Sequence, residues 1–161
     1  MLIRQACSCE MPYVLRIYHT AQAFMKLTGN TDQWADTYPN HELLTKDIES
    51  GNLYTVTRHG IIVGAFAMFT GDDPTYAEID GAWCNDEPYI SIHRVASDGS
   101  CHGIVQAIVQ YVAKLKNNVR IDTHEKNTVM LHLLESNGFT RCGIIHLADG
   151  SPRIAFQHCS K

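Results

Sequence analysis

The sequence predicts a mixed α/β fold in which helices flank a mostly antiparallel sheet. Hairpin signals predict two antiparallel strand pairs, 53–58 with 61–70 and 139–147 with 153–158. Between these pairs the chain predicts a strand at 89–96, a long amphipathic helix and a strand at 119–123. Such a unit makes its two strands parallel through a right-handed crossover. No linker or repeat interrupts the chain, so residues 1–161 are expected to form one domain.

The N-terminal part of the chain predicts a strand and two helices. A short first strand is expected at 2–6, before Pro12, which suits the first turn of a helix. Apolar residues then follow at helical spacing until Gly29 ends the run. Asn40 is a suitable N-cap for a second helix at 41–49.

Two smaller elements complete the prediction. A short strand is expected at 76–79, between the first hairpin and the crossover unit. After the crossover, Asn127 can cap a helix that runs to Asn137, and Gly138 supplies its left-handed stop.

Composition excludes several classes of protein. The chain is 45% hydrophobic and 19% charged, which is typical of a globular domain. Its net charge of −4 and lack of a basic run give no general attraction to nucleic acids or to anionic membranes. No apolar stretch is long enough to span a membrane, and the strand-like sequence after Met1 does not predict a signal peptide. The expected location is therefore the cytoplasm.

The six cysteines are expected to be reduced thiols, because the chain has a full core and no secretory signal. Cys7 and Cys9 are the closest pair. They are interpreted as alternating residues at a strand end, and no matching second pair follows them. This pattern argues against a zinc site, so no metal is expected.

The crossover unit contains a candidate anion site. Gly99 and Gly103 bracket the loop between the strand and the helix, and the first turn of a helix has free N–H groups and the positive end of the helix dipole. A phosphate can bind such a loop without any basic side chain. Without further information, the pattern favours a simpler role for the two glycines as turn and helix-packing residues, because many connections between strands and helices have this pattern.

The order of these motifs resembles the GNAT superfamily of acetyl-CoA-dependent N-acetyltransferases. The strings IHRVAS, RIDTH, NGF, CGII and DGSPRIAFQ also resemble a bacterial branch of small acetyltransferases without assigned functions. The resemblance covers nearly the whole chain. It implies a GNAT-type sheet in which the two parallel strands splay apart and form a slot for acetyl-CoA.

The resemblance assigns the cofactor contacts mostly to backbone groups. Val95, Ala96 and Ser97 would pair with the pantetheine arm like an added strand. The loop N–H groups that would hold the pyrophosphate belong to Ser100, Cys101, His102, Gly103, Ile104 and Val105. Asn127 would contact the arm in addition to capping its helix. Of the loop residues common in the superfamily, this chain keeps only Gly103.

Acyl transfer to an amine needs a group that removes a proton from the incoming ammonium. His93 shares a strand face with Tyr89 and Ser91, and the resemblance turns this face toward the acetyl group. Histidine can accept a proton near neutral pH, so His93 is the first catalytic candidate, with core packing as an equal alternative. The face carries no carboxylate. His124 is the second candidate, and its alternative role is that of a loop residue beside the next helix.

Three further assignments concern neighbouring residues. Many superfamily members carry a tyrosine that protonates the leaving thiolate, and Leu134 occupies that position here. Arg94 is expected to point away from His93 and to pair with Asp122 on the neighbouring strand as a structural ion pair. The residues predicted to wall the acceptor pocket are Trp34, Tyr38, Trp83, Tyr89 and Ser91, although the tryptophans and Tyr38 are equally suited to closing the core.

The sequence therefore predicts an acetyl-CoA-dependent N-acetyltransferase that acts on a primary amine of a small molecule or peptide, with a homodimer as a candidate assembly. The alternative is a non-catalytic module that binds acyl-CoA and regulates another process with the same fold. No nucleic acid or membrane partner is expected.

Overall fold

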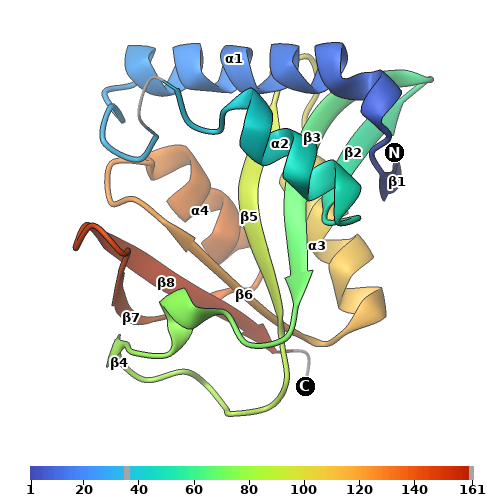
Figure 1. Cartoon of the computed structure of the whole chain (residues 1–161). Helices are drawn as coiled ribbons and strands as arrows, with labels where there is room; N and C mark the ends of the chain where they lie inside the picture. The colour runs from blue at the N-terminus through green and yellow to red at the C-terminus, as the bar shows by residue number, and fades with distance from the viewer. Residues whose placement is uncertain (35–36, 160–161) are drawn as a thin grey trace.

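The computed structural model describes residues 1–34 and 37–159, and its eight strands form one sheet in the order β1-β2-β3-β5-β6-β8-β7-β4 (Figure 1). The strands are β1 (Leu2–Gln5), β2 (Leu53–Arg58), β3 (Ile61–Thr70), β4 (Asp80–Gly81), β5 (Ile90–Ser97), β6 (Asn118–Thr123), β7 (Thr140–His146) and β8 (Pro152–Cys159). Among the described strands, only β5 and β6 pair in parallel. The predicted mixed, mostly antiparallel fold is confirmed.

Helices cover both faces of this sheet. They are α1 (Met11–Leu27), α2 (His41–Glu49), α3 (Ile104–Leu115) and α4 (Thr128–Ser136). In Figure 1, α2 lies in front of the sheet and α3 behind it. One hydrophobic core joins α1 and α2 to the sheet, and a second joins α3 and α4 to its other face. Each face of the sheet is therefore buried by a helix pair, which holds the strands of the crossover unit rigidly between two packed layers.

The two parallel strands separate after a short paired segment. Their ladder joins only Ile90–Ile92 to Val119–Ile121, although β5 continues to Ser97 and β6 continues to Thr123. Figure 1 shows the two strands diverging beyond this point. The splay that the family resemblance implied is present, and it leaves the β6-facing edge of residues 93–97 unpaired by β6.

Capping residues account for the helix boundaries. The side chain of Asn40 accepts a hydrogen bond from the Leu43 N–H, and the side chain of Asn127 accepts one from the Met130 N–H. Gly138 has a φ of 83° directly after α4, as the left-handed stop requires. These predicted boundaries are confirmed within about two residues, which is the usual uncertainty at helix ends.

The prediction of a strand at 76–79 is wrong. The segment instead forms the short 3-10 helix η2 (Pro74–Tyr76), followed by the two-residue strand β4. Pro74 has the fixed φ that a helical turn needs, and the Asp73 side chain accepts a hydrogen bond from the Thr75 N–H at the start of the turn. Local capping therefore outweighs the strand-like pattern of this segment.

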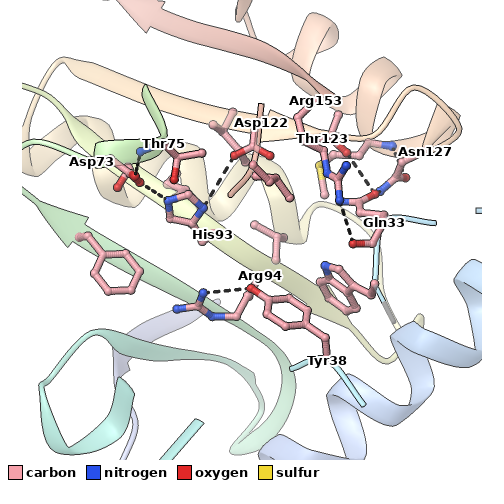
Figure 2. A pocket seen from close by; sticks show the side chains of 18 of the residues that line it. Gln33, Tyr38, Asp73, Thr75, His93, Arg94, Asp122, Thr123, Asn127 and Arg153 are labelled. Carbon is pink, nitrogen blue, oxygen red and sulfur yellow. Dashed lines mark hydrogen bonds and ion pairs between the residues drawn. The ribbon is translucent and has the colours of Figure 1, made fainter. Parts of the chain in front are cut away.

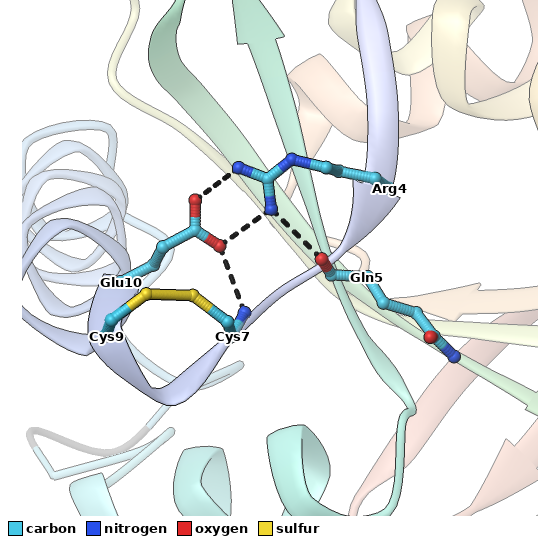
Figure 3. Close-up of a disulfide and its surroundings, with 5 residues drawn as sticks. All are labelled: Arg4, Gln5, Cys7, Cys9 and Glu10. Atoms are coloured by element: carbon cyan, nitrogen blue, oxygen red, sulfur yellow. Dashed lines mark hydrogen bonds and ion pairs between the residues drawn. A yellow bond between two sulfur atoms is a disulfide. The ribbon is translucent and has the colours of Figure 1, made fainter.

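The prediction that all six cysteines are reduced is also wrong, because Cys7 and Cys9 form a disulfide (Figure 3). Strand β1 ends at Gln5, and the 3-10 turn η1 (Ser8–Glu10) brings the two Cα atoms to 5.4 Å. The interpretation of these residues as an extended strand end missed the turn. The other four cysteines are free.

The described part of the chain contains neither a metal-binding cluster nor a membrane-spanning helix. Its side chains form no cluster of histidine, cysteine and carboxylate residues suited to a metal ion. Among the same residues, no helix combines the length and the apolar character needed to cross a membrane.

Gly143 provides a test of the sheet edge. Its φ is 151°, and a Cβ atom built there would lie 2.2 Å from the Asp80 carbonyl oxygen of β4. Gly143→Ala should therefore break the pairing of β4 with β7 and lower the free energy of unfolding by about 2–3 kcal/mol in urea titrations. Gly150→Ala is the control, since no atom lies within 4 Å of its added Cβ. A loss no larger than that of the control would contradict the close approach.

Candidate active site

A cavity of about 740 Å³ lies where β5 and β6 diverge. Its walls come from the end of α1 and the loop after it, the loop after β3, strands β5 and β6, the start of α4 and the β7–β8 hairpin. Five aspartates line it: Asp32, Asp72, Asp73, Asp122 and Asp149. Elements distant in the sequence thus place several charged side chains around one cleft, which is the usual setting of a ligand site.

His93 lies on the floor of this cavity between two carboxylates (Figure 2). Its Nε2 is 2.7 Å from Asp73 Oδ2, and its Nδ1 is 3.8 Å from Asp122 Oδ2. The Asp73 N–H also donates a hydrogen bond of 2.8 Å to the Tyr89 hydroxyl, which fixes the loop that carries Asp73. The strand face of His93 carries no carboxylate of its own, as the sequence indicates, and both neighbouring carboxylates come from other elements, the loop after β3 and strand β6.

The two carboxylates have opposite pKa shifts. Burial raises the pKa of Asp73, but the hydrogen bond and charge of His93 and the hydrogen bonds from Thr75 outweigh it, so the pKa lies below its usual value. Burial raises the pKa of Asp122 above its usual value despite the opposing effects of His93 and of the Tyr76 hydroxyl, which lies 2.8 Å from Oδ2. Asp73 is therefore the ionised partner of His93.

Arg94 lines the same cavity and does not pair with Asp122, so both predictions for this residue are wrong. Strand β5 has a bulge in which Arg94 and Val95 lie between the residues paired with Ala65 and Ala67 of β3, and Arg94 has a φ of 55°. The bulge breaks the two-residue alternation on which the predicted facing rested.

The guanidinium of Arg94 binds a different carboxylate. Its Nη2 donates a hydrogen bond of 2.7 Å to Asp47 Oδ2 on α2, and its Nη1 donates one of 3.2 Å to the Tyr38 hydroxyl. The two charged side chains are only 10% and 6% exposed. This chain of contacts ties α2 and the α1–α2 loop to the bulge in β5.

The predicted acceptor residues divide into two groups. Trp34, Tyr38 and Ser91 line the cavity, and the Ser91 hydroxyl is buried without a hydrogen-bond partner in the described structure. Tyr89 and Trp83 are not among the lining residues. The Trp83 Nε1–H donates to the Tyr76 carbonyl, and both rings pack on Tyr76, which in turn holds Asp122. Tyr89 and Trp83 therefore support the cavity from behind.

His124 and Asn127 follow β6. His124 is not among the lining residues, and its Nδ1 accepts a hydrogen bond from the Lys126 N–H. Burial lowers its pKa, with a further decrease from the charge of Arg153. Asn127 does line the cavity, and its Nδ2 donates a hydrogen bond of 2.9 Å to Gln33 Oε1. Gln33 thus joins the α1–α2 loop to the start of α4.

The predicted acetyl-CoA residues form a continuous edge and loop. Val95 lines the cavity, and Ala96 and Ser97 pair with β3, so their strand has an edge that β6 leaves free. Gly103, with a φ of 83°, directly precedes α3, and a Cβ atom added there would lie 4.0 Å from the Gln106 side-chain oxygen. The edge and the open helix start fit the arm and the pyrophosphate of acetyl-CoA.

One feature of the loop opposes an anion. Asp98 Oδ1 accepts hydrogen bonds from the Ser100 N–H at 2.9 Å and from the Ser100 hydroxyl at 2.6 Å. The Asp98 carboxylate therefore already binds the Ser100 N–H, which is one of the donors predicted to hold the pyrophosphate. The remaining loop N–H groups, from Cys101 to Val105, are the ones left for a ligand.

Leu134 is fully buried in the core between α3, α4 and the sheet. Its side chain has no group that can donate a proton. The sequence did not single out Asp73, Gln33 or Arg153 as site residues, because each reaches the cavity through a loop or hairpin whose path is fixed only by tertiary packing. The Asp73-Pro74 pair, a common turn start, was the one local signal.

Comparisons with solved structures identify similar proteins. A GNAT-family acetyltransferase from Streptococcus agalactiae is 30% identical, with a TM-score of 0.90 and coverage of 99% of this chain and 95% of that chain. An acetyltransferase, described as putative, from Staphylococcus aureus is 21% identical, with a TM-score of 0.71 and complete coverage of both chains. No family model and no curated protein matches the sequence.

A third solved structure shares the fold at lower identity. The GNAT-like decarboxylase GphF, determined with isobutyryl-CoA, is 14% identical, with a TM-score of 0.67 and coverage of 99% of each chain. At this identity the likeness concerns the fold alone. The same fold thus supports more than one reaction, so the chemistry has to be argued from the site.

The Arg94–Asp47 pair can be tested through stability. Asp47→Ala leaves a buried guanidinium without its carboxylate, and the free energy of unfolding should fall by about 3–5 kcal/mol. Glu135→Ala is the matched control, because it breaks the exposed pair with Arg141 and should cost less than about 1 kcal/mol. Equal losses in the two variants, measured by urea denaturation, would show that Asp47 is not the partner that Arg94 needs.

Proposed function

Because this chain belongs to the GNAT family of acetyltransferases, we propose that it transfers an acetyl group from acetyl-CoA to a primary amine of a small molecule or peptide. The observation that carries the proposal is the pairing of His93 with the ionised Asp73 in the cavity where β5 and β6 diverge. Acetyl-CoA, when bound, supplies an activated acetyl group as a thioester. The residues of this chain bind the reactants and move the proton.

The free edge of β5 is the proposed contact for the pantetheine arm, through the backbone of Val95, Ala96 and Ser97. The N–H groups from Cys101 to Val105 are proposed to hold the pyrophosphate at the start of α3. Asn127, at the cavity wall, completes the arm contacts with its amide. These contacts would place the acetyl carbon near His93, where the two strands separate.

His93 is the proposed proton acceptor. Its Nε2–H donates to Asp73, which leaves Nδ1 without a hydrogen and able to accept a proton from an ammonium group. Asp73 orients the ring and stabilises the imidazolium that forms, so it acts as a positioning residue. The aromatic side chains of Trp34 and Tyr38 form one wall of the cavity and limit the access of water.

A non-catalytic acyl-CoA-binding module remains the second candidate, since Leu134 offers no acid and Asp98 occupies a loop donor. The two candidates differ in one measurement. A catalyst releases free thiol from acetyl-CoA when an amine is added, whereas a binding module gains thermal stability from acetyl-CoA without releasing thiol.

The proposed base predicts a specific pH profile. We expect kcat/KM to rise with pH over the range in which histidine loses its proton, because only neutral His93 can accept one. His93→Gln should remove this rise and lower kcat/KM roughly a hundredfold. Asp73→Asn removes the carboxylate that orients the ring and stabilises the imidazolium, so it should also lower kcat/KM.

Acetyl-CoA affinity serves as the control for both variants, since neither side chain belongs to the proposed arm contacts. Calorimetric titration should show affinities close to that of the unchanged protein. A His93→Gln variant that keeps the pH-dependent rise would assign His93 to packing and make His124 the next residue to replace.

Asp98 allows a test of the cofactor loop. Asp98→Asn keeps the oxygen that accepts the Ser100 hydrogen bonds but removes a negative charge beside the proposed pyrophosphate site. Acetyl-CoA should bind about two- to fivefold more tightly at low salt, with a smaller gain at high salt. Unchanged or weaker binding in calorimetry would argue against pyrophosphate binding in this loop.

A further inference from the structure

Arg153 is a buried cation that the proposed proton transfer does not use. It lies near the start of β8, is 5% exposed and lines the cavity. Its guanidinium donates hydrogen bonds to two backbone carbonyls, those of Pro152 at 2.9 Å and of Gln33 at 3.2 Å. Figure 2 shows the side chain directed toward Gln33 at the edge of the cavity.

Among the described residues, no carboxylate lies within ion-pair distance of Arg153. The nearby carboxylates of the cavity have closer partners: Asp73 binds His93, Asp122 accepts from Tyr76, Asp32 pairs with Lys126 and Asp149 accepts from Ser151. The charge of Arg153 opposes the rise that burial causes in the pKa of Asp122, and it adds to the hydrogen bonds from Ser151 that lower the pKa of Asp149, without binding either carboxylate directly. A guanidinium removed from water without a directly bound counter-ion is costly. The position therefore suits the anionic group of a ligand.

The other two buried arginines of the site region differ from Arg153. Arg94 has Asp47 as its carboxylate. Arg120 lies between the rings of Trp83 and Tyr89, 4.1 and 4.0 Å from their centroids, and is not among the lining residues. Arg153 thus combines burial, a place in the cavity wall and the lack of a directly bound carboxylate or aromatic ring among the described residues.

The strand register places Arg153 close to the proposed base. Asp122 pairs with Ala155, so Arg153 is its diagonal neighbour on the same face of the sheet, about 7–8 Å away between backbone positions. The Asp122 carboxylate in turn lies 3.8 Å from His93. His93, Asp122 and Arg153 therefore follow one another along the same part of the cavity wall, where a single small molecule can contact both His93 and Arg153.

We propose that the acceptor is a small free amino acid whose carboxylate binds Arg153 and whose amine lies at His93. Arginine matches a carboxylate with two parallel hydrogen bonds, which gives both charge and orientation. This inference rests on the proposed amine acetylation and names its substrate class. Asp72 and Asp149, which are exposed residues of the cavity wall, disfavour amino acids with acidic side chains.

The reaction balances without a further reactant. The C–N bond of an N-acetylamino acid forms and the thioester C–S bond breaks. The ammonium loses two protons: His93 passes one to solvent, and the departing thiolate takes the other to give the free thiol.

The competing explanation is structural. Arg153 binds the Gln33 carbonyl and holds the α1–α2 loop against the β7–β8 hairpin. A loop clamp affects every acceptor equally, whereas a carboxylate site affects only acceptors that carry a carboxylate. Substrates that differ in this one group separate the two roles.

The experiment incubates the full-length protein with acetyl-CoA and pairs of acceptors, each a free L-amino acid and its carboxamide. Acetylated products are quantified by mass spectrometry. We expect kcat/KM for at least one amino acid to exceed that of its carboxamide about thirtyfold or more, the usual effect of removing one partner of a buried charge pair. Aspartate and glutamate should be poor acceptors.

Arg153→Met has a similar side-chain length without the charge, and it should remove this preference while changing carboxamide acetylation less than about threefold. Arg153→Lys keeps the charge without the paired hydrogen bonds and should retain part of the preference. Arg141→Met, on the neighbouring strand, is the matched control because Arg141 is exposed, and it should change neither rate.

Two results would overturn the inference: equal rates with the amino acid and its carboxamide, or an equal loss of both in Arg153→Met. If no amine is acetylated, the proposed function fails separately. Calorimetric binding of the same pairs then decides the inference, because a carboxylate preference that Arg153→Met removes supports the site, and the lack of any preference rejects it.

Discussion

The end of the parallel ladder between β5 and β6 is the constraint on which the site depends. Pairing stops after Ile92 and Ile121 because the two strands diverge, and every proposed catalytic side chain lies at or beyond that point. The bulge at Arg94 increases this divergence and turns two consecutive residues of β5 toward the cavity. Helices packed on both faces hold the strands apart, since a gap in a sheet persists only where the surrounding core is rigid.

Apart from Arg153, the buried charged side chains described around this gap are arranged in local pairs. Arg94 is neutralised by Asp47, His93 is flanked by Asp73 and Asp122, and Tyr76 supplies a hydroxyl to Asp122. Each pair links the sheet to a different covering element, so the charges fix the positions of α2 and of the loop after β3. Stability and site geometry therefore depend on the same contacts, and a change made for one alters the other.

Much of the fold could be predicted from the sequence, because its signals are local. Asn40, Asn127 and Gly138 act within one helical turn, and the hairpins depend on adjacent residues. The separation of β5 and β6 was predicted only from the resemblance to the GNAT superfamily. The site was less predictable, since the facing of Arg94 depends on a bulge set by pairing with β3.

The contact between Asp73 and His93 is a second feature of the site that the sequence could not predict. It reaches His93 from a loop 20 residues earlier in the chain, and no sequence spacing records that approach. The disulfide between Cys7 and Cys9 was missed because a 3-10 turn replaced the expected strand end. In each case tertiary packing or an unrecognised turn decided the outcome, and alternation along a strand gave the wrong facing or geometry.

The two proton transfers that the proposed amine acetylation needs are supported unequally by the residues of this chain. The base side is a complete arrangement of His93, Asp73 and Tyr89, joined by hydrogen bonds of 2.7 and 2.8 Å. On the acid side, Leu134 is fully enclosed by α3, α4 and the sheet, and a polar group there would lie in the hydrophobic core. A thiolate is a weaker base than an amine and needs less help to leave. Under the proposed function, the charged groups of the site therefore serve the proton transfer that precedes attack, whereas the apolar residue at position 134 serves packing.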